Sequence, residues 1–185
     1  MVPYDDVYAP EPDPDSVTGS AEWGEARERT VRWHDPLVGA GAGATMSGLD
    51  YLQSMLDGRL PPPPIAATMG FLLASVGPGE ATFVGTPDES VYNPIGVVHG
   101  GFVCTLLDSA LGCAVHTTLP AGVGYTSIEI KVNYLRPVTA GSGELTARGW
   151  VTKPGRRVAF ADADVRAADG KVLATASGSC LIMSG

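Results

Sequence analysis

The sequence predicts an α+β fold in which an antiparallel sheet covers one long central helix. Three observations predict it. Residues 99–117 form an apolar stretch with helical spacing. The segment TSIEIKVNYLRP at 126–137 then alternates apolar and polar residues, which is typical of a half-buried strand. Further strand-like segments follow it, and two shorter ones precede the helix, so a single long helix is set among many strands.

The beginning of the chain is predicted to form an N-terminal arm that is not part of the hydrophobic core. Residues 1–46 are acidic and rich in Pro and Gly, so we expect a partly disordered N-terminal arm, with GAGAG at 39–43 as a flexible link. We place the main domain at residues 47–185. The acidic start lacks the basic and apolar regions of a secretory signal, and no run approaches the ~18 apolar residues of a membrane helix. These features predict a cytoplasmic protein that does not enter a membrane.

Charge and cysteine content exclude several classes of protein. The net charge of −8 argues against nucleic-acid binding, although residues 131–185 carry 8 basic and 4 acidic side chains and can hold a small anion. The spacing of the three cysteines suits neither a zinc site nor a disulfide framework, so we expect reduced thiols and no metal. They are Cys104, Cys113 and Cys180.

The elements of the main domain follow one another with clear start and stop signals. A helix is expected at 47–58, between a capping Ser47 and Gly58, and PPPP at 61–64 is expected to be extended. TMGFLLASVGPGEATFVGTP predicts two strands joined at Pro78-Gly79. After the long helix and the alternating strand, GELTARGWVTK, RRVAFADADVRA and VLATASGSCLIM predict three more strands, the last two joined by ADGK.

The long helix contains one carboxylate, Asp108, within a wide apolar surface. An unpaired carboxylate in an apolar setting is costly, so Asp108 must be paired, protonated or open to a cleft. It is either a structural aspartate bonded to its neighbours or a reactive group.

His99, Gly100 and Gly101 form the expected start of the same helix. Glycines permit close approach of a ligand, and the first-turn N–H groups lack partners within the helix. This end of a helix suits an oxyanion that develops on a carbonyl, although a tight turn would also need glycine.

The spacing of His99 and Asp108 predicts a dimer. Nine residues along a helix are about 13 Å and about 900° of rotation, which places the two side chains on opposite sides. One chain therefore cannot bring them to one site, whereas two helices packed antiparallel about a two-fold axis can. Ser109, Gly112 and Cys113 are small enough for such an approach.

These motifs resemble the PaaI-like branch of the hotdog-fold acyl-CoA thioesterases. The resemblance rests on NPIGVVHGGFVCTLLDSALG followed by TSIEIKVNYLRP and extends from about residue 47 to the C-terminus. It implies a hotdog fold, an acyl-CoA substrate, no cofactor or metal, and a homodimer or a dimer of dimers with shared sites.

The resemblance also implies roles for individual residues. Asp108 is the general base or nucleophile, and the N–H of Gly100 polarises the thioester carbonyl. His99 and Asn93 shape the turn and orient carbonyl or water, and Ser127 helps to place the water. Gly101, Gly124 and Tyr125 border the substrate, and Arg156 and Arg157 contact the CoA phosphates.

Other assignments remain open at this point. Cys104 is a poor nucleophile because the neighbouring carboxylate raises the pKa of a thiol, and His116 is interpreted as a helix-end residue that faces solvent. A non-catalytic acyl-CoA-binding module and an enoyl-CoA hydratase are the alternative functions.

Overall fold

The computed structural model describes residues 24–184, and the chain forms two units, residues 1–30 and residues 31–185. The described part of the first unit, residues 24–30, contains no helix or strand. Much of the predicted N-terminal arm lies outside the described residues. The second unit contains all the described helices and strands, and no helix within its described part is long and apolar enough to cross a membrane.

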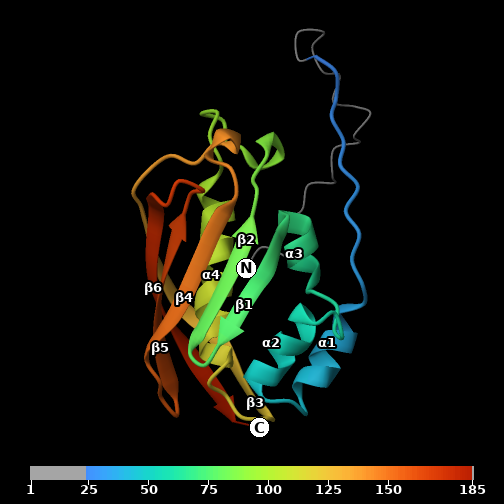
Figure 1. The fold of residues 1–185 in the computed structure, drawn as a ribbon, viewed down its shortest axis with the longest axis vertical. Coiled ribbons are helices and arrows are strands. Elements are labelled where there is room, and N and C mark those ends of the chain that lie inside the picture. The colour runs from blue at the N-terminus through green and yellow to red at the C-terminus, as the bar shows by residue number, and fades with distance from the viewer. Residues whose placement is uncertain (1–23, 185) are drawn as a thin grey trace, which may run out of the picture. The chain divides into compact units, whose positions relative to one another are not determined.

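The second unit is a six-stranded antiparallel sheet folded around a central helix, as predicted (Figure 1). The helix α4 lies against the inner face of the sheet and packs on strands β2 to β6. The strand order is β1-β2-β4-β5-β6-β3, so β1 and β3 are the two edges. The strands are β1 Phe71–Gly77, β2 Glu80–Gly85, β3 Val123–Tyr134, β4 Leu145–Lys153, β5 Val158–Arg166 and β6 Val172–Ser184; the helix α4 is Gly100–His116.

Three short helices precede the sheet, and two of them were not expected from the sequence. They are α1 Pro36–Gly43, α2 Gly48–Leu56 and α3 Pro64–Met69. Only α2 was predicted, and its Ser47 hydroxyl accepts a hydrogen bond of 3.2 Å from the Asp50 N–H. The expected flexible link at 39–43 is instead the second half of α1, and the last proline of PPPP is the first residue of α3. Two 3-10 turns, η3 Glu89–Val91 and η4 Ala140–Ser142, complete the elements.

The core forms where α4 meets small residues of the sheet. The apolar side chains of α4 are buried, and the strands beneath them present mainly Ala and Gly, which let the helix approach closely. The closest approach is at Gly149, where a Cβ atom would lie 2.3 Å from the Ala110 carbonyl oxygen. The buried residues of α4 are Phe102, Val103, Leu106, Leu107, Ala110, Leu111, Gly112, Ala114 and Val115.

This contact predicts a large loss of stability for Gly149→Ala. The added methyl group must push the α4 backbone off the sheet, so we expect the free energy of unfolding to fall by about 3 kcal/mol. Chemical denaturation followed by circular dichroism measures the change. Gly77→Ala is the matched control, because nothing lies within 4 Å of its Cβ position. Equal stability of the two variants would contradict the proposed close contact.

Strand β3 contains a bulge that changes which side chains face the helix. Ser127 pairs with Cys180 and Glu129 pairs with Ser179, so Ile128 has no partner of its own. A regular strand would place Ser127 and Ile130 on opposite faces, whereas the bulge turns both toward α4. The alternation of apolar and polar residues in TSIEIKVNYLRP predicts that Ile128 shares the buried face with Ile130, but the Ile128 side chain is 54% exposed.

Candidate active site

His99 is the N-cap of α4, and its side chain closes the start of the helix. The Gly101 N–H donates a hydrogen bond of 2.8 Å to His99 Nδ1. A Cβ atom on Gly101 would lie 2.8 Å from the same nitrogen, so this geometry requires glycine there. Because Nδ1 accepts, the proton of the neutral ring is on Nε2. The first turn of α4 is thus fixed by its own cap.

The N–H of Gly100 remains available for a ligand. It makes no hydrogen bond to any residue between 24 and 184. The Gly100 carbonyl accepts a hydrogen bond of 2.9 Å from the Tyr134 hydroxyl, and a Cβ atom would lie 3.1 Å from the Tyr134 ring. The end of β3 therefore holds the start of α4 in place, with one N–H at the positive end of the helix dipole left without a partner.

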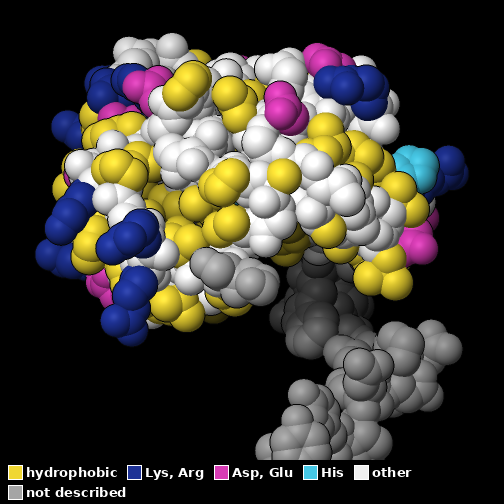
Figure 2. Space-filling view, turned by 90° about the horizontal axis from the view of Figure 1, so that it is seen from below, with side chains coloured by type: hydrophobic (Ala, Val, Ile, Leu, Met, Phe, Trp, Pro, Cys, Tyr) yellow, Lys and Arg dark blue, Asp and Glu magenta, His cyan; other side chains and the backbone are white. Residues whose placement is uncertain are grey.

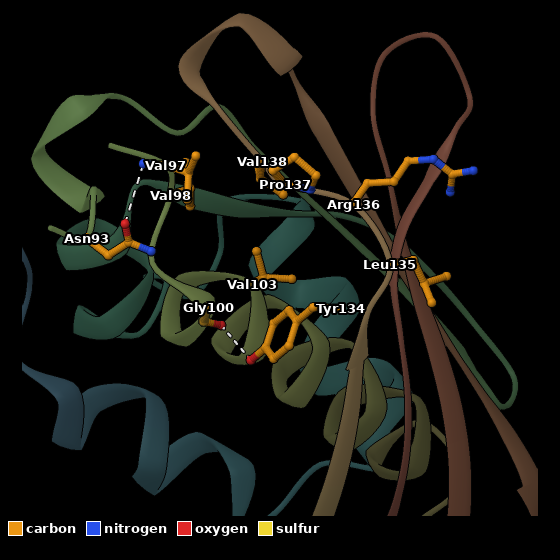
Figure 3. Close-up of a pocket in the computed structure, with 10 residues that line it drawn as sticks. All are labelled: Asn93, Val97, Val98, Gly100, Val103, Tyr134, Leu135, Arg136, Pro137 and Val138. Carbon is orange, nitrogen blue, oxygen red and sulfur yellow. Dashed lines mark hydrogen bonds between the residues drawn. The ribbon is translucent and has the colours of Figure 1, made fainter. Parts of the chain in front are cut away.

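Asn93 folds the loop before the helix and lies near Gly100 (Figure 3). Its Oδ1 accepts from the N–H groups of Ile95 at 3.1 Å and Val97 at 3.4 Å. The amide nitrogen is turned away from Val97 and remains as a donor. Asn93 and Gly100 line a cavity of about 320 Å³ together with Tyr134 and Arg136.

Asp108 is half-buried and hydrogen-bonded to β3. The Ser127 hydroxyl donates to Asp108 Oδ1 over 2.8 Å. Both line a second cavity, of about 400 Å³, which Glu129 also lines. The bulge at Ile128 makes the contact possible, because it directs Ser127 toward the helix.

The predicted catalytic residues form two separate groups within one chain. Asp108 and Ser127 line one cavity, and Asn93 and Gly100 line another. His99 and Gly101 border a third hollow beside them. Gly100 and Asp108 are eight residues apart in one helix, about 12 Å along its axis.

The three cysteines lie close enough to Asp108 for its charge to raise the pKa of each thiol, which the sequence indicated for Cys104 but not for Cys113 or Cys180. Burial, and then the charge of Asp108, raises the pKa of Cys104. Burial raises the pKa of Cys113 to about 12, against a hydrogen bond to Tyr125 that lowers it. Burial is also the main cause of the raised pKa of Cys180. All three are free thiols that stay protonated at neutral pH, which makes them poor nucleophiles.

Gly124 and Tyr125 lie in a different part of the molecule from Gly100. They line a cavity of about 640 Å³ with Tyr51 and His116. The interpretation of His116 as a solvent-facing residue is wrong: its ring is half-buried between Tyr51 and Tyr125. The absence of a side chain at Gly112 makes room for Tyr125 of the same chain, since a Cβ atom on Gly112 would lie 2.9 Å from the Tyr125 ring.

Arg156 and Arg157 lie in the turn between β4 and β5, and both are exposed. This turn is at the lower end of the sheet in Figure 1, the end that Figure 2 shows, where Lys and Arg side chains gather on the left beside an apolar area. Within the described chain, no ion pair or hydrogen bond engages either guanidinium group. The two charges are therefore free to bind an anion.

Comparison with known proteins identifies the family. The thioesterase superfamily model matches residues 95–174. Human acyl-coenzyme A thioesterase 13 is 30% identical over 103 residues, 55% of this chain and 72% of that protein. A relative from Halobacterium salinarum is 40% identical over 72 residues, so that match spans 38% of this chain and 46% of the relative.

Solved structures agree with these matches. The phenylacetic acid degradation-related protein of Ralstonia eutropha is similar with a TM-score of 0.65 and 30% identity, over 71% of this chain and 98% of that one. A thioesterase family protein from Silicibacter pomeroyi has a TM-score of 0.63 and 28% identity, over 72% and 96% of the two chains. The Escherichia coli PaaI protein, at 22% identity, has the same fold with a TM-score of 0.65 over 76% and 98% of the two chains. The chain therefore belongs to the thioesterase superfamily and, within it, to the PaaI-like hotdog thioester hydrolases.

Proposed function

We propose that the protein hydrolyses an acyl-CoA thioester to a free acid and CoA, with Asp108 at the reacting centre. The observation that carries the proposal is the 2.8 Å hydrogen bond from Ser127 Oγ to Asp108 Oδ1. It holds a carboxylate at an open cavity, on a helix whose other inward side chains are apolar. A carboxylate in this setting can take a proton from water or attack a carbonyl carbon itself.

The net reaction is the same whether Asp108 acts as a general base or as a nucleophile. The carbonyl carbon gains an oxygen, either from water or first from Asp108, and the C–S bond then breaks. CoA leaves as a thiol after it receives a proton, and if an anhydride forms on Asp108, water hydrolyses it. Ser127 orients the carboxylate and the attacking water in either version.

The oxyanion is stabilised at the start of a helix. The N–H of Gly100 has no partner within the described chain and lies at the positive end of α4. A donor aimed at the developing negative charge is among the strongest contributions to such a reaction. His99 holds this turn through Gly101, and the Asn93 amide supplies a second donor beside it.

A second copy of the chain completes the site in this proposal. Gly100 and Asp108 lie about 12 Å apart along α4 and border different cavities, so one chain does not bring them to one thioester. Strand β3 is a long edge with an exposed Ile128 and an exposed Tyr134, which favours pairing with another β3. A two-fold pairing would place Asp108 of one copy near Gly100 of the other. A dimer, or a dimer of dimers, is the expected form.

The CoA part of the substrate is assigned to the basic turn. Arg156 and Arg157 are exposed and make no ion pair within residues 24–184. Paired guanidinium groups suit phosphate, because each can donate two parallel hydrogen bonds.

A panel of acyl-CoA thioesters with thiol detection tests this function. Straight-chain and aryl acyl groups of increasing size should release free CoA thiol, at a rate that depends on the acyl group. Release from no member of the panel, together with measurable CoA binding, would instead indicate a binding module. Loss of crotonyl-CoA absorbance without thiol release would indicate a hydratase.

A further inference from the structure

The start of α4 contains two successive peptide units whose polar groups are almost all hydrogen-bonded. In the unit that joins His99 to Gly100, the His99 carbonyl accepts a hydrogen bond of 3.0 Å from the Phe102 N–H. In the next unit, the Gly101 N–H donates to the His99 side chain over 2.8 Å. The Gly100 carbonyl of that unit accepts from the Tyr134 hydroxyl over 2.9 Å (Figure 3). Only the Gly100 N–H makes no hydrogen bond to any residue between 24 and 184, so the proposed oxyanion donor is held entirely through its neighbours.

Tyr134 supplies the one contact of this set that comes from another element. His99 and Phe102 belong to α4 and its cap, whereas Tyr134 is the last residue of β3. Glycine has no Cβ to restrict its backbone, and two glycines follow one another here, so the local bonds alone allow the turn to tilt. A Cβ atom on Gly100 would lie 3.1 Å from the Tyr134 ring and 3.2 Å from its hydroxyl oxygen. Tyr134 therefore occupies the space beside Gly100 and ties the turn to the sheet.

The Tyr134 hydroxyl is a stable donor at the proposed reacting centre. Burial is the main cause of the raised pKa of Tyr134, so the hydroxyl keeps its proton at neutral pH. A carbonyl oxygen can only accept, so the hydroxyl donates to Gly100. Tyr134 and Gly100 line the same cavity as Asn93. The contact thus lies where the thioester carbonyl is proposed to bind.

Strand β3 holds both catalytic groups of its own chain. Ser127 contacts Asp108 and Tyr134 contacts Gly100, seven residues further along the strand. In a regular strand, residues an odd number apart face opposite sides of the sheet. The bulge at Ile128 removes this conflict, because the extra residue lets both side chains face α4. In a dimer with shared sites, the two contacts of one strand then serve two different sites.

We propose that Tyr134 is a positioning residue for catalysis, whose hydroxyl holds the Gly100 carbonyl so that the Gly100 N–H points at the thioester carbonyl oxygen that faces Asp108 of a second copy. The inference rests on the proposed thioesterase function. Tyr134 takes no proton from the substrate and forms no bond to it. Its effect is on the direction of a donor, which matters most when negative charge develops on the carbonyl oxygen.

Tyr134→Phe tests the role of the hydroxyl, because the ring that packs on Gly100 remains. We expect kcat for thiol release to fall about tenfold while KM changes by less than about twofold, since the donor serves the transition state more than the bound substrate. Tyr92→Phe is the matched control. The Tyr92 hydroxyl also makes one hydrogen bond to the backbone, of 2.8 Å from the Ala140 N–H, but not to the start of α4. It should keep the wild-type kcat.

Two hybrid dimers that contain the same substitutions in total locate the effect. The first pairs an Asp108→Asn chain with a Tyr134→Phe chain. One of its sites then has wild-type Asp108, Gly100 and Tyr134, so about half of the wild-type activity is expected. The second pairs a wild-type chain with an Asp108→Asn/Tyr134→Phe chain. Its one site with Asp108 lacks the Tyr134 hydroxyl, so about one-twentieth of the wild-type activity is expected.

A general loss of stability cannot distinguish these hybrids, because their composition is the same. Equal activities would mean that Tyr134 does not act on one half of the site, and a first hybrid weaker than the second would mean that Asp108 and Tyr134 of one chain serve the same site. Either result, or a wild-type kcat in Tyr134→Phe, would overturn the inference.

A binding measurement separates this inference from the proposed function. S-(2-oxooctyl)-CoA cannot be hydrolysed and has a carbonyl, which S-octyl-CoA lacks, and both can be titrated by calorimetry. The wild type should bind the ketone about fivefold more tightly, the usual contribution of one hydrogen bond. Tyr134→Phe should lose most of this preference and bind S-octyl-CoA as the wild type does. That result would support the inference even if no thioester were hydrolysed.

The contrary results are equally distinct. Hydrolysis of the thioester panel with the same ketone preference in the wild type and in Tyr134→Phe would retain the function and reject the role of Tyr134. Absence of any ketone preference in the wild type would reject it as well.

Discussion

Asp108→Asn is expected to lower kcat for thioester hydrolysis by about 10²- to 10⁴-fold, the usual contribution of a general base. The amide keeps the shape of the side chain and can still accept the 2.8 Å hydrogen bond from Ser127 Oγ. It cannot take a proton from water, and it is a far weaker nucleophile than a carboxylate. Steady-state thiol release, with the best substrate of the panel, measures the loss.

Glu129→Gln is the matched control for this substitution. Glu129 is the other acidic residue that lines the same cavity, but it is exposed and is not the partner of Ser127. Its amide variant should retain the wild-type rate. A wild-type kcat in Asp108→Asn, or the large loss in Glu129→Gln instead, would remove Asp108 from the reacting centre.

Two inactive variants are expected to restore each other when their chains are mixed. Asp108→Asn removes one half of the proposed site, and Asn93→Asp removes the amide donor of the other half. Asn93→Asp also keeps an oxygen for the N–H groups of Ile95 and Val97, so the loop should persist. In a statistical mixture half of the dimers are hybrids, and each hybrid has one intact site, so about a quarter of the wild-type activity should return.

The chains can be mixed by co-expression or by joint refolding, and the hybrid can be isolated with two different affinity tags. The control mixes Asp108→Asn with the double variant Asn93→Asp/Asp108→Asn, which contains no wild-type site in any combination. Recovery should be absent there. An isolated hybrid of the two single variants without activity would show that each site is built from one chain.

The long helix α4, the strands and the helix α2 were predictable from the sequence, whereas α1 and α3 were not. The α4 helix and all six strands have runs long enough for their period to be recognised. The helix α1 has the sequence PLVGAGAG, whose glycines disfavour a helix on their own. Asp35 caps α1 and Pro36 is its first residue, and both are favourable signals for the start of a helix. The glycine-rich sequence that follows them nevertheless argues against a helix when the sequence is considered alone.

The sequence nominated the residues of the candidate site but not all of their contacts. Asp108 stood out as the one carboxylate of an apolar helix, and the resemblance implied that His99 shapes the turn before it, whereas the role of His99 as the N-cap of α4 came from the structure. The contact of Ser127 with Asp108 was not visible, because a regular strand would direct Ser127 to the same side as Glu129 and away from Ile130. The bulge that changes this is a property of the pairing of β3 with β6.

The sequence by itself determined the fold class and the family, and it nominated the residues proposed to bear the chemistry, because these depend on local period and on motifs a few residues long. The tertiary structure alone decided how those residues are grouped. It placed Asp108 with Ser127 and Gly100 with Tyr134, and it gathered Tyr51, His116 and Tyr125 around one cavity. Such contacts join residues 9 to 74 positions apart, and their geometry depends on the register of a sheet and the approach of a helix, which no local pattern encodes.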